Sequence, residues 1–298
     1  MLIAIMSGAV SILVAAGIYG KATDGGLVRF AAEDHKLIRL LESHGIRGYL
    51  KSKYTKLRLA EFDEGKPKVL IVGDSFSQDV FNTLRENHYL HQLSVSTFYI
   101  NRHCGNLYVK RDLIPLVGDR YVPECKNHRR YHHPTVQQRM READYIIIAS
   151  RWKDWPIALL PESFSNIAAI SDAKVLLFSS KRFQRLRAFQ LAQYDRETRS
   201  ELRFPMAEDF SAHLAKFRTL EFPAIDIPML VCGDRSDCPL FTDEGDAISY
   251  DGSHLTPGGA GWMGQLFYRE VPLYRQMVNA GVAATGARID PATGIIQR

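Results

Sequence analysis

Two short stretches of this 298-residue chain combine residue types that can carry out nucleophilic catalysis. In the first, the aliphatic run Val69–Val72 leads into Gly-Asp-Ser, which ends at Ser75. In the second, Asp251 and His254 stand three positions apart near the C-terminus. A serine hydroxyl needs a base that takes its proton, and an imidazole base needs an acceptor that fixes its tautomer. The residue types therefore predict a Ser75 nucleophile, a His254 base and an Asp251 that orients the base.

The residues around Ser75 predict a strand, a tight turn and a helix. Val69–Val72 suits a strand buried on both faces of a parallel sheet, and apolar residues recur at helical spacing from Val80 onwards. This arrangement puts Ser75 at the carboxyl edge of the sheet, where a helix N-terminus presents backbone N–H groups. A serine that only caps the helix is the alternative, as are solvated loop residues for Asp251 and His254. The order of the two motifs, one after the first strand and one before the last helix, favours the catalytic interpretation.

Short apolar runs alternate with helical patterns over the rest of the chain. The predicted strands are Val69–Val72, Val95–Ile100, Tyr145–Ala149, Val175–Phe178 and Met229–Val231. The predicted helices are Val80–Leu90, Pro134–Ala143, Arg185–Tyr194 and Ala207–Thr219, followed by a last helix introduced by Pro257. The alternation indicates an α/β fold with a central parallel sheet and helices on both faces.

The N-terminal segment has the length and composition of a membrane span. Residues 1–20 carry no charged side chain, so we expect a transmembrane helix there, followed by a polar connector with one helix at residues 21–66. A cleaved signal peptide with a small-residue site at Val14-Ala15-Ala16 is the alternative, although its basic leading region is absent. Lys21 and Arg29 favour a cytoplasmic location for the part of the chain after the span. The cysteines favour the opposite side.

Four cysteines fall into two local pairs, Cys104 with Cys125 and Cys232 with Cys238. Of the three pairings that four cysteines permit, the local one is the simplest, and free thiols in a reducing cytosol are the alternative. Together with the apolar N-terminal segment, the cysteines favour two disulfides in an oxidising compartment such as a periplasm.

Charge and composition exclude some classes of partner. The excess of 38 basic over 33 acidic residues is too mild to indicate nucleic-acid binding. The basic loop at residues 126–133 contains His128, His132 and His133, but their spacing matches no firm metal-ligand pattern and no paired carboxylates accompany them. We expect no nucleic-acid partner, no metal and no cofactor, because the serine chemistry needs none.

On its two motifs the chain resembles the SGNH (GDSL-like) hydrolase superfamily, over about residues 67–275. The resemblance implies a three-layer, flavodoxin-like catalytic domain at 67–275 and a C-terminal tail at 276–298. It also implies the nucleophile, base and orienting roles for Ser75, His254 and Asp251. Members usually place a glycine after the second strand to bind the oxyanion, and Gly105 matches that position.

The third predicted strand departs from the superfamily pattern. Members carry a Gly-x-Asn-Asp block there, whereas this strand ends in Ala-Ser followed by Arg151 and Trp152. These two residues are candidates for a cation and an aromatic wall that contact a sugar. The alternative is that Trp152 packs in the core and Arg151 is a surface charge.

The same departure resembles one branch, the SGNH domain fused to membrane acyltransferases that O-acylate surface polysaccharides. The Cys-x5-Cys segment shortly before the His254 motif is similar to that branch as well. The resemblance implies an inner-membrane location with the domain facing the periplasm, and a chain that corresponds to the last membrane helix plus the fused domain. It also implies two partners, a membrane acyltransferase bundle that presents the acyl donor and a cell-surface glycan acceptor.

The function expected from these observations is transfer of an acyl group, with acetyl expected, to glycan hydroxyls through an acyl-enzyme on Ser75. A carbohydrate acetyl esterase, in which water replaces the glycan, is the alternative enzyme. A non-catalytic glycan-binding or assembly module is the alternative from another class. Binding alone would not need the Ser75, His254 and Asp251 set.

Overall fold

The computed structural model of the chain describes residues 46–126, 130–185 and 194–297, with a few isolated positions before residue 46. The transmembrane helix expected at residues 1–20 lies outside these residues apart from Gly17, as do most of the connector before residue 46 and most of the helix expected at Arg185–Tyr194. Among the described helices, none is both long enough and apolar enough to span a bilayer. The fold described here is therefore that of the region after residue 45.

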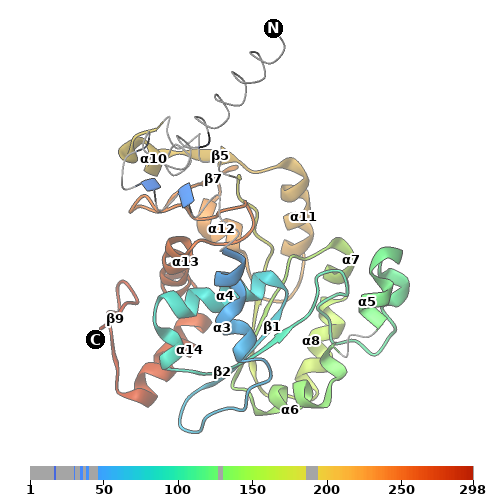
Figure 1. Cartoon of the computed structure of the whole chain (residues 1–298). Helices are drawn as coiled ribbons and strands as arrows, with labels where there is room; N and C mark the ends of the chain where they lie inside the picture. The colour runs from blue at the N-terminus through green and yellow to red at the C-terminus, as the bar shows by residue number, and fades with distance from the viewer. Residues whose placement is uncertain are drawn as a thin grey trace, which may run out of the picture.

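A five-stranded parallel sheet forms the centre of the molecule (Figure 1). Its strands are β1 (Lys68–Gly73), β2 (Ser94–Tyr99), β3 (Tyr145–Ala149), β4 (Lys174–Phe178) and β6 (Ala224–Ile225). Their order in space is β2-β1-β3-β4-β6, so β1 lies between β2 and β3. The parallel α/β sheet predicted from the sequence is confirmed. In doubly wound sheets, ligands bind outside the carboxyl ends of the strands where the strand order reverses, which here is at β1.

Strand β1 is buried on both faces because each face packs on a different layer of helices. Val69 and Ile71 belong to the core on one side of the sheet, and Leu70 and Val72 belong to the core on the other. Successive side chains of a strand point to opposite faces. A continuous aliphatic run is therefore what a central parallel strand requires.

The helical layer on one face joins the two ends of the candidate site. It contains α3 (Ile46–Lys56), α4 (Ser75–Glu86), α13 (Pro257–Glu270) and α14 (Pro272–Thr285) (Figure 1). Helix α13 packs closely on α4, since a Cβ on Gly264 would lie 2.7 Å from the Thr83 carbonyl oxygen. The Asn87 side chain also donates to the Gly261 carbonyl oxygen at 2.9 Å. These contacts tie the helix that begins at Ser75 to the helix that follows His254.

The opposite face is covered by α6 (Pro134–Glu142) and α8 (Leu160–Ala168), which bury Met140 and Phe164 against the sheet. The other helices of the described residues are α5 (Val122–Lys126), α7 (Asp154–Ile157), α10 (Arg196–Glu201), α11 (Glu208–Arg218) and α12 (Ile227–Cys232). Single 3-10 turns lie at Tyr89–His91, Ile114–Leu116, Asp119–Tyr121 and Arg130–His132. Two small antiparallel sheets pair β5 (Arg203–Pro205) with β7 (Asp237–Pro239) and β8 (Arg288–Ile289) with β9 (Ile296–Gln297).

The position of the fifth strand differs from the prediction. Met229–Val231, predicted as a strand, lies inside helix α12, and the fifth strand of the sheet is the two-residue β6 just before it. The Asp226 carboxylate caps α12 by accepting from the Met229 backbone N–H at 3.1 Å, and Pro228 occupies the first turn. A cap followed by proline starts a helix, so it outweighs the β propensity of the short apolar run.

Packing extends beyond the predicted domain limits of 67 and 275. Tyr54 in α3 is 2% exposed, and its hydroxyl lies 2.9 Å from Ser77 Oγ. In α14, Met277 and Val278 are fully buried. The stretches interpreted as connector and tail thus supply core residues to the domain.

Two disulfides join the cysteines in local pairs. Cys104–Cys125 links the loop after β2 to α5, with a Cα–Cα distance of 5.1 Å. Cys232–Cys238 links the end of α12 to β7, at 4.5 Å. Both pairings are those predicted from the sequence.

Candidate active site

A glycine turn delivers Ser75 to the carboxyl end of β1. The turn begins at Gly73, whose φ is +150°, and a Cβ there would lie 1.8 Å from the Ala149 carbonyl oxygen. Only glycine fits this close approach of two parallel strands. The Asp74 side chain then accepts from the Phe76 backbone N–H at 2.8 Å, which starts α4 at Ser75. This cap explains why the helix begins five residues before the predicted start at Val80.

Asp74 also binds the backbone at the end of the neighbouring strand β3. Its second carboxylate oxygen accepts from the backbone N–H of Arg151, just after β3, at 2.9 Å. Burial raises the pKa of Asp74 to about 6, although the two N–H donors and the charges of Lys181 and Arg102 favour the ionised form. The carboxyl group that shapes the Ser75 turn thus depends on donors from two separate segments.

The Asp251–His254 turn is held by its own backbone and by the loop after β4. The Asp251 Oδ1 accepts from the backbone N–H groups of Ser253 and His254, both at 2.8 Å. Gly252, which follows Asp251, has a φ of +83°, and its carbonyl oxygen accepts from the Phe183 backbone N–H at 2.7 Å. A Cβ on Gly252 would lie 2.6 Å from the Phe183 carbonyl oxygen, so this tight turn requires glycine.

The two motifs meet in space. His254 Nε2 lies 2.8 Å from Ser75 Oγ, and His254 Nδ1 lies 2.7 Å from Asp251 Oδ2. Burial opposes ionisation of Asp251, but the hydrogen bond and charge of His254 and the two backbone N–H groups outweigh it and lower the pKa of Asp251 to about 2. An ionised carboxylate can only accept, so Nδ1 carries the proton and Nε2 is free to accept from the Ser75 hydroxyl. The arrangement can perform nucleophilic acyl chemistry.

An oxyanion formed at Ser75 would find donors at the start of α4. As the first residue of the helix, Ser75 has a backbone N–H without an acceptor inside the helix. Gly105 lies in the loop after β2 with a φ of +76°, and a Cβ there would lie 2.4 Å from the Trp155 indole. The adjacent Asn106 side chain lies 3.4 Å from the Val72 carbonyl oxygen, so this loop folds over the end of β1. A role for Gly105 as the second donor stays a prediction.

Arg151 and Trp152 have different environments. Trp152 is 5% exposed, and its indole N–H donates to the Phe178 carbonyl oxygen at 2.8 Å. The ring packs in the core against Phe217, although Trp152 also lines a pocket beside Arg151, so its role as an aromatic wall stays a prediction. The Arg151 side chain is exposed and lines a pocket of about 240 Å³ that also contacts Ser253.

A buried ion pair behind the site was not found from the sequence. Lys181, after β4, donates to Asp79 Oδ2 at 2.6 Å, and both side chains are almost fully buried. The other carboxylate oxygen of Asp79 accepts from the Leu255 backbone N–H at 3.1 Å, next to His254. The Lys181 ammonium also lies 3.6 Å from the centre of the Phe76 ring. The sequence signals were only a lysine after a buried strand and an acid one helical turn beyond Ser75.

The histidines of the basic loop serve the fold where the structure describes them. His132 Nε2 lies 3.0 Å from the Val109 carbonyl oxygen, and the His133 side chain accepts from the Thr135 backbone N–H at the start of α6. Residues 127–129, which include His128, lie outside the described residues. Within the described ranges, no group of three or more histidine, cysteine or acidic side chains could hold a metal ion.

A family model matches the part of the chain that contains this site. No curated protein matches the sequence. Residues 48–269 match a family model described as "SGNH domain (fused to AT3 domains)", in which AT3 stands for acyltransferase-3. The match begins inside α3 and ends in α13, so it includes both motifs and the whole of the central sheet. It covers more than half of the chain, and the protein therefore belongs to the SGNH hydrolase superfamily, in the family whose SGNH domain is fused to acyltransferase-3 domains.

Proposed function

We propose that this protein transfers an acyl group, with acetyl expected, to a hydroxyl of a cell-envelope glycan through an acyl-enzyme on Ser75. The observation that carries the proposal is the hydrogen-bonded series from Ser75 Oγ through His254 to Asp251, at 2.8 and 2.7 Å. The family supports an esterase or acyltransferase. Its description, with fusion to acyltransferase-3 domains, favours transfer over hydrolysis.

The reaction has two halves that use the same base. Ser75 Oγ attacks the acyl carbonyl carbon while His254 Nε2 takes the hydroxyl proton, and that proton then passes to the leaving group. In the second half, His254 takes the proton of a sugar hydroxyl, the sugar oxygen attacks the acyl carbon, and the proton returns to Ser75. The backbone N–H of Ser75 stabilises the oxyanion in both halves.

We further propose a membrane acyltransferase as the source of the acyl group. The family description names such domains as fusion partners of this SGNH domain. An inner-membrane location with the domain in the periplasm is consistent with the two disulfides, which form in oxidising compartments. The N-terminal segment, proposed as a membrane helix, would keep the domain beside the donor.

The test of the nucleophile compares Ser75→Ala with Ser165→Ala, an exposed serine on α8. With a small acetyl ester, we expect Ser75→Ala to lose roughly three orders of magnitude or more in kcat, because the nucleophile acts as a unit with its base. Ser165→Ala should keep the parent rate. Mass spectrometry of the parent should find an acetyl group on the peptide that contains Ser75. An unchanged rate in folded Ser75→Ala protein would refute the mechanism.

A second measurement separates transferase from esterase. The full chain is given an acetyl donor and an oligosaccharide, and free acetate and acetylated sugar are both measured. Transfer that rises with acceptor concentration, at the expense of acetate release, supports the proposal. Rapid deacetylation of an acetylated glycan with no acylation would favour the esterase.

A further inference from the structure

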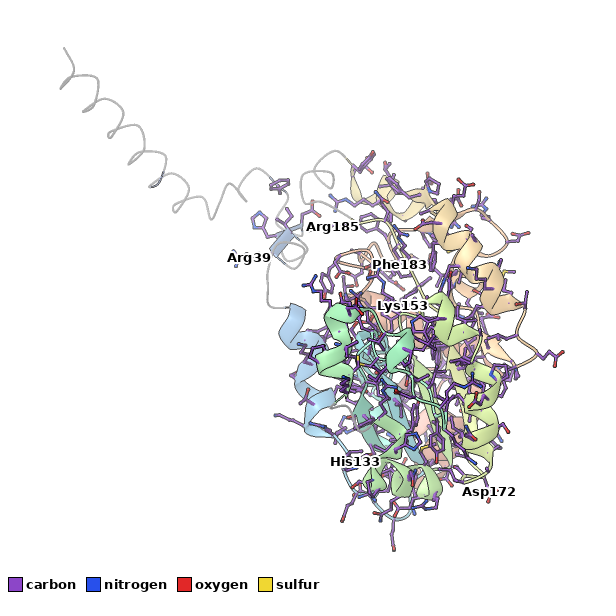
Figure 2. The ribbon with its side chains drawn as sticks, turned by 90° about the vertical axis from the view of Figure 1, so that its right-hand side faces the viewer. Arg39, His133, Lys153, Asp172, Phe183 and Arg185 are labelled. Carbon is purple, nitrogen blue, oxygen red and sulfur yellow. A yellow bond between two sulfur atoms is a disulfide. The ribbon has the colours of Figure 1, made fainter. Side chains whose placement is uncertain are left out.

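The loops around Ser75 carry an excess of positive charge. Ser75 follows β1, the strand between β2 and β3. Arg102 follows β2, Arg151 and Lys153 follow β3, and Arg182 follows β4. Because the carboxyl ends of parallel strands share one edge, all four cations lie at the edge that holds the nucleophile. In Figure 2, Lys153 is labelled well above Asp172, which precedes β4 and lies at the lower end of the domain. We call these four residues the cationic rim.

Contacts bring the members of the cationic rim close to the site and to each other. Arg151 donates its backbone N–H to Asp74, next to Ser75. Arg151 and Arg182 line the same pocket of about 240 Å³, together with Ser253 of the His254 turn. The loop after β2 begins beside β1, since Ile100 donates its backbone N–H to the Gly73 carbonyl oxygen at 2.8 Å. Arg102 lies two residues further along this loop.

Aromatic contacts join the loops after β2 and β3. Arg102 Nε donates to His103 Nε2 at 3.1 Å, and the His103 ring stacks on Tyr121 with centroids 3.5 Å apart. The Lys153 ammonium lies 5.6 Å from the centre of the same Tyr121 ring. Burial and the charges of Lys153 and Arg102 lower the pKa of His103 to about 4. The imidazole is therefore neutral at physiological pH and adds no further charge.

Most cations of the rim form no direct ion pair with a protein carboxylate that the structure describes. In the described part of the chain, Arg102, Arg151 and Lys153 form no ion pair, whereas Arg182 pairs with the exposed Asp209. The nearby acids have other partners: Asp251 binds His254, Asp154 binds Lys216, and Glu124 binds the Asn101 side chain. Burial and the charges of Arg102 and Arg182 lower the pKa of Arg151, and the charges of Asp74 and Asp251 offset this only in part, so repulsion among the cations remains. An anion placed among them would relieve that repulsion.

We propose that the acceptor glycan is anionic and that the cationic rim binds its charged group while a neighbouring hydroxyl faces His254. The acceptor hydroxyl must reach His254 Nε2, and the pocket with Arg151 and Arg182 borders the same turn through Ser253. A uronic-acid carboxylate and a phosphate substituent share the oxygen geometry that guanidinium groups bind in pairs. The inference rests on the proposed function for the role of the sugar as acceptor.

The test measures binding in the Ser75→Ala background, so that its result does not depend on turnover. The full chain is titrated with trigalacturonate, with its uncharged methyl ester and with a phosphorylated oligomannoside. We expect at least one charged sugar to bind about tenfold or more tightly than the ester, with a preference that shrinks in high salt. The stronger of the two charged ligands identifies the carboxylate or the phosphate as the natural group.

Matched variants locate the binding. In the same background, Arg102→Gln and Arg151→Gln should each weaken binding of the charged sugar by about threefold to tenfold. The control Arg141→Gln removes the same charge from an exposed residue at the end of α6, near the amino end of β3. It should bind like the parent.

Three outcomes would overturn the proposal: equal binding of the ester and the charged sugars, an equal loss in Arg141→Gln, or retention by anionic lipid vesicles without binding of any charged sugar. If one of the arginine variants fails to fold, the comparison of charged and uncharged sugars at low and high salt, in the Ser75→Ala protein alone, still tests the proposal. The proposed function fails separately: undiminished ester hydrolysis in Ser75→Ala, with the preference for charged sugars kept, would refute the mechanism alone.

Discussion

Asp74 and Asp251 lie close to the same serine, yet their surroundings shift their pKa values in opposite directions. Burial raises the pKa of Asp74 to about 6, and hydrogen bonds with the charge of His254 lower the pKa of Asp251 to about 2. Asp251 is therefore ionised at any pH at which the protein works, and it can hold His254 Nδ1–H. Asp74 is a structural acceptor whose ionised form costs free energy in the fold.

Asp251→Asn should remove activity and leave the fold intact. The amide oxygen can still accept from the Ser253 and His254 backbone N–H groups, but the amide nitrogen cannot accept from the imidazole. The wrong tautomer is then favoured, and we expect kcat to fall by about three to four orders of magnitude. The measurement is ester hydrolysis together with thermal unfolding, with exposed Asp243→Asn as the control. A variant within tenfold of the parent rate would contradict the role of Asp251.

The raised pKa of Asp74 predicts a loss of stability as the pH rises from about 4 to about 6. In this window the folded chain keeps a proton that the unfolded chain has released, so the contribution of the group is fully present below about pH 4 and is lost through pH 6. The shift corresponds to about 3 kcal/mol. We would measure the free energy of unfolding of the parent and of Asp74→Asn by urea denaturation across this range. A difference between the two proteins that does not change with pH would contradict the prediction.

At the scale of elements, the Asp79–Lys181 pair joins three segments that are distant in the sequence. Asp79 lies in α4, Lys181 follows β4, and Leu255, which donates its backbone N–H to Asp79, precedes α13. A buried ion pair adds little net stability by itself. Its value here is that it fixes the helix that begins at Ser75 relative to the turn that holds His254.

Lys181→Met should destabilise the protein more than the double variant with Asp79→Asn. The single change leaves a buried carboxylate without its cation, which costs about 3–5 kcal/mol. In the double variant, both buried charges are removed, and the Asn side chain at position 79 can still accept from the Leu255 backbone N–H. Urea denaturation of the single and double variants gives the coupling free energy. Equal destabilisation in both would show that Asp79 does not depend on Lys181.

The two disulfides should contribute unequally to stability. Cys104–Cys125 closes a separation of 21 residues and Cys232–Cys238 one of 6. Chain entropy then gives about 3 kcal/mol for the first and about 2 kcal/mol for the second. Serine replacement of each pair, followed by urea denaturation, tests this order. Replacing the first pair should also slow ester hydrolysis, because Cys104 adjoins Gly105. The reverse order of stabilities would contradict the entropic account.

At the scale of the whole molecule, the sequence predicted the parts that depend on local pattern. Strand β1 and the two motifs could be predicted because local side chains determine them. The aliphatic run determines the buried strand, and the side chains of the two motifs determine the turns and their hydrogen bonds. The prediction of a strand at Met229–Val231 was wrong because the Asp226 cap and Pro228 start a helix there, whatever the β propensity of the apolar residues. The Asp79–Lys181 pair was not predictable, since its partners meet only when the loop after β4 folds against α4.

The site also imposes a requirement on the surroundings of the molecule. An acyl-enzyme transfers to a sugar only if the acceptor arrives before water, so the acceptor must be held close and water excluded. We therefore predict that the chain without residues 1–29 hydrolyses esters slowly and acylates glycan poorly. Cells that carry the full chain and its membrane partner should acylate glycan efficiently. Acetate release and glycan acylation are compared in both settings, and efficient transfer by the shortened chain alone would contradict the prediction.

The distance between Ser75 and His254 along the chain, 179 residues, has a consequence in time. At translation rates of about 5–20 residues per second, His254, the proposed base, leaves the ribosome about 10–40 s after Ser75, the proposed nucleophile. Throughout that interval the serine has no imidazole to take its proton, and α13 is not yet present to pack on α4. On the proposed mechanism, a nascent or prematurely terminated chain is therefore expected to be inert toward the acyl esters of the compartment in which it is made. Reactivity is then expected to begin only when the last part of the domain has been synthesised and folded.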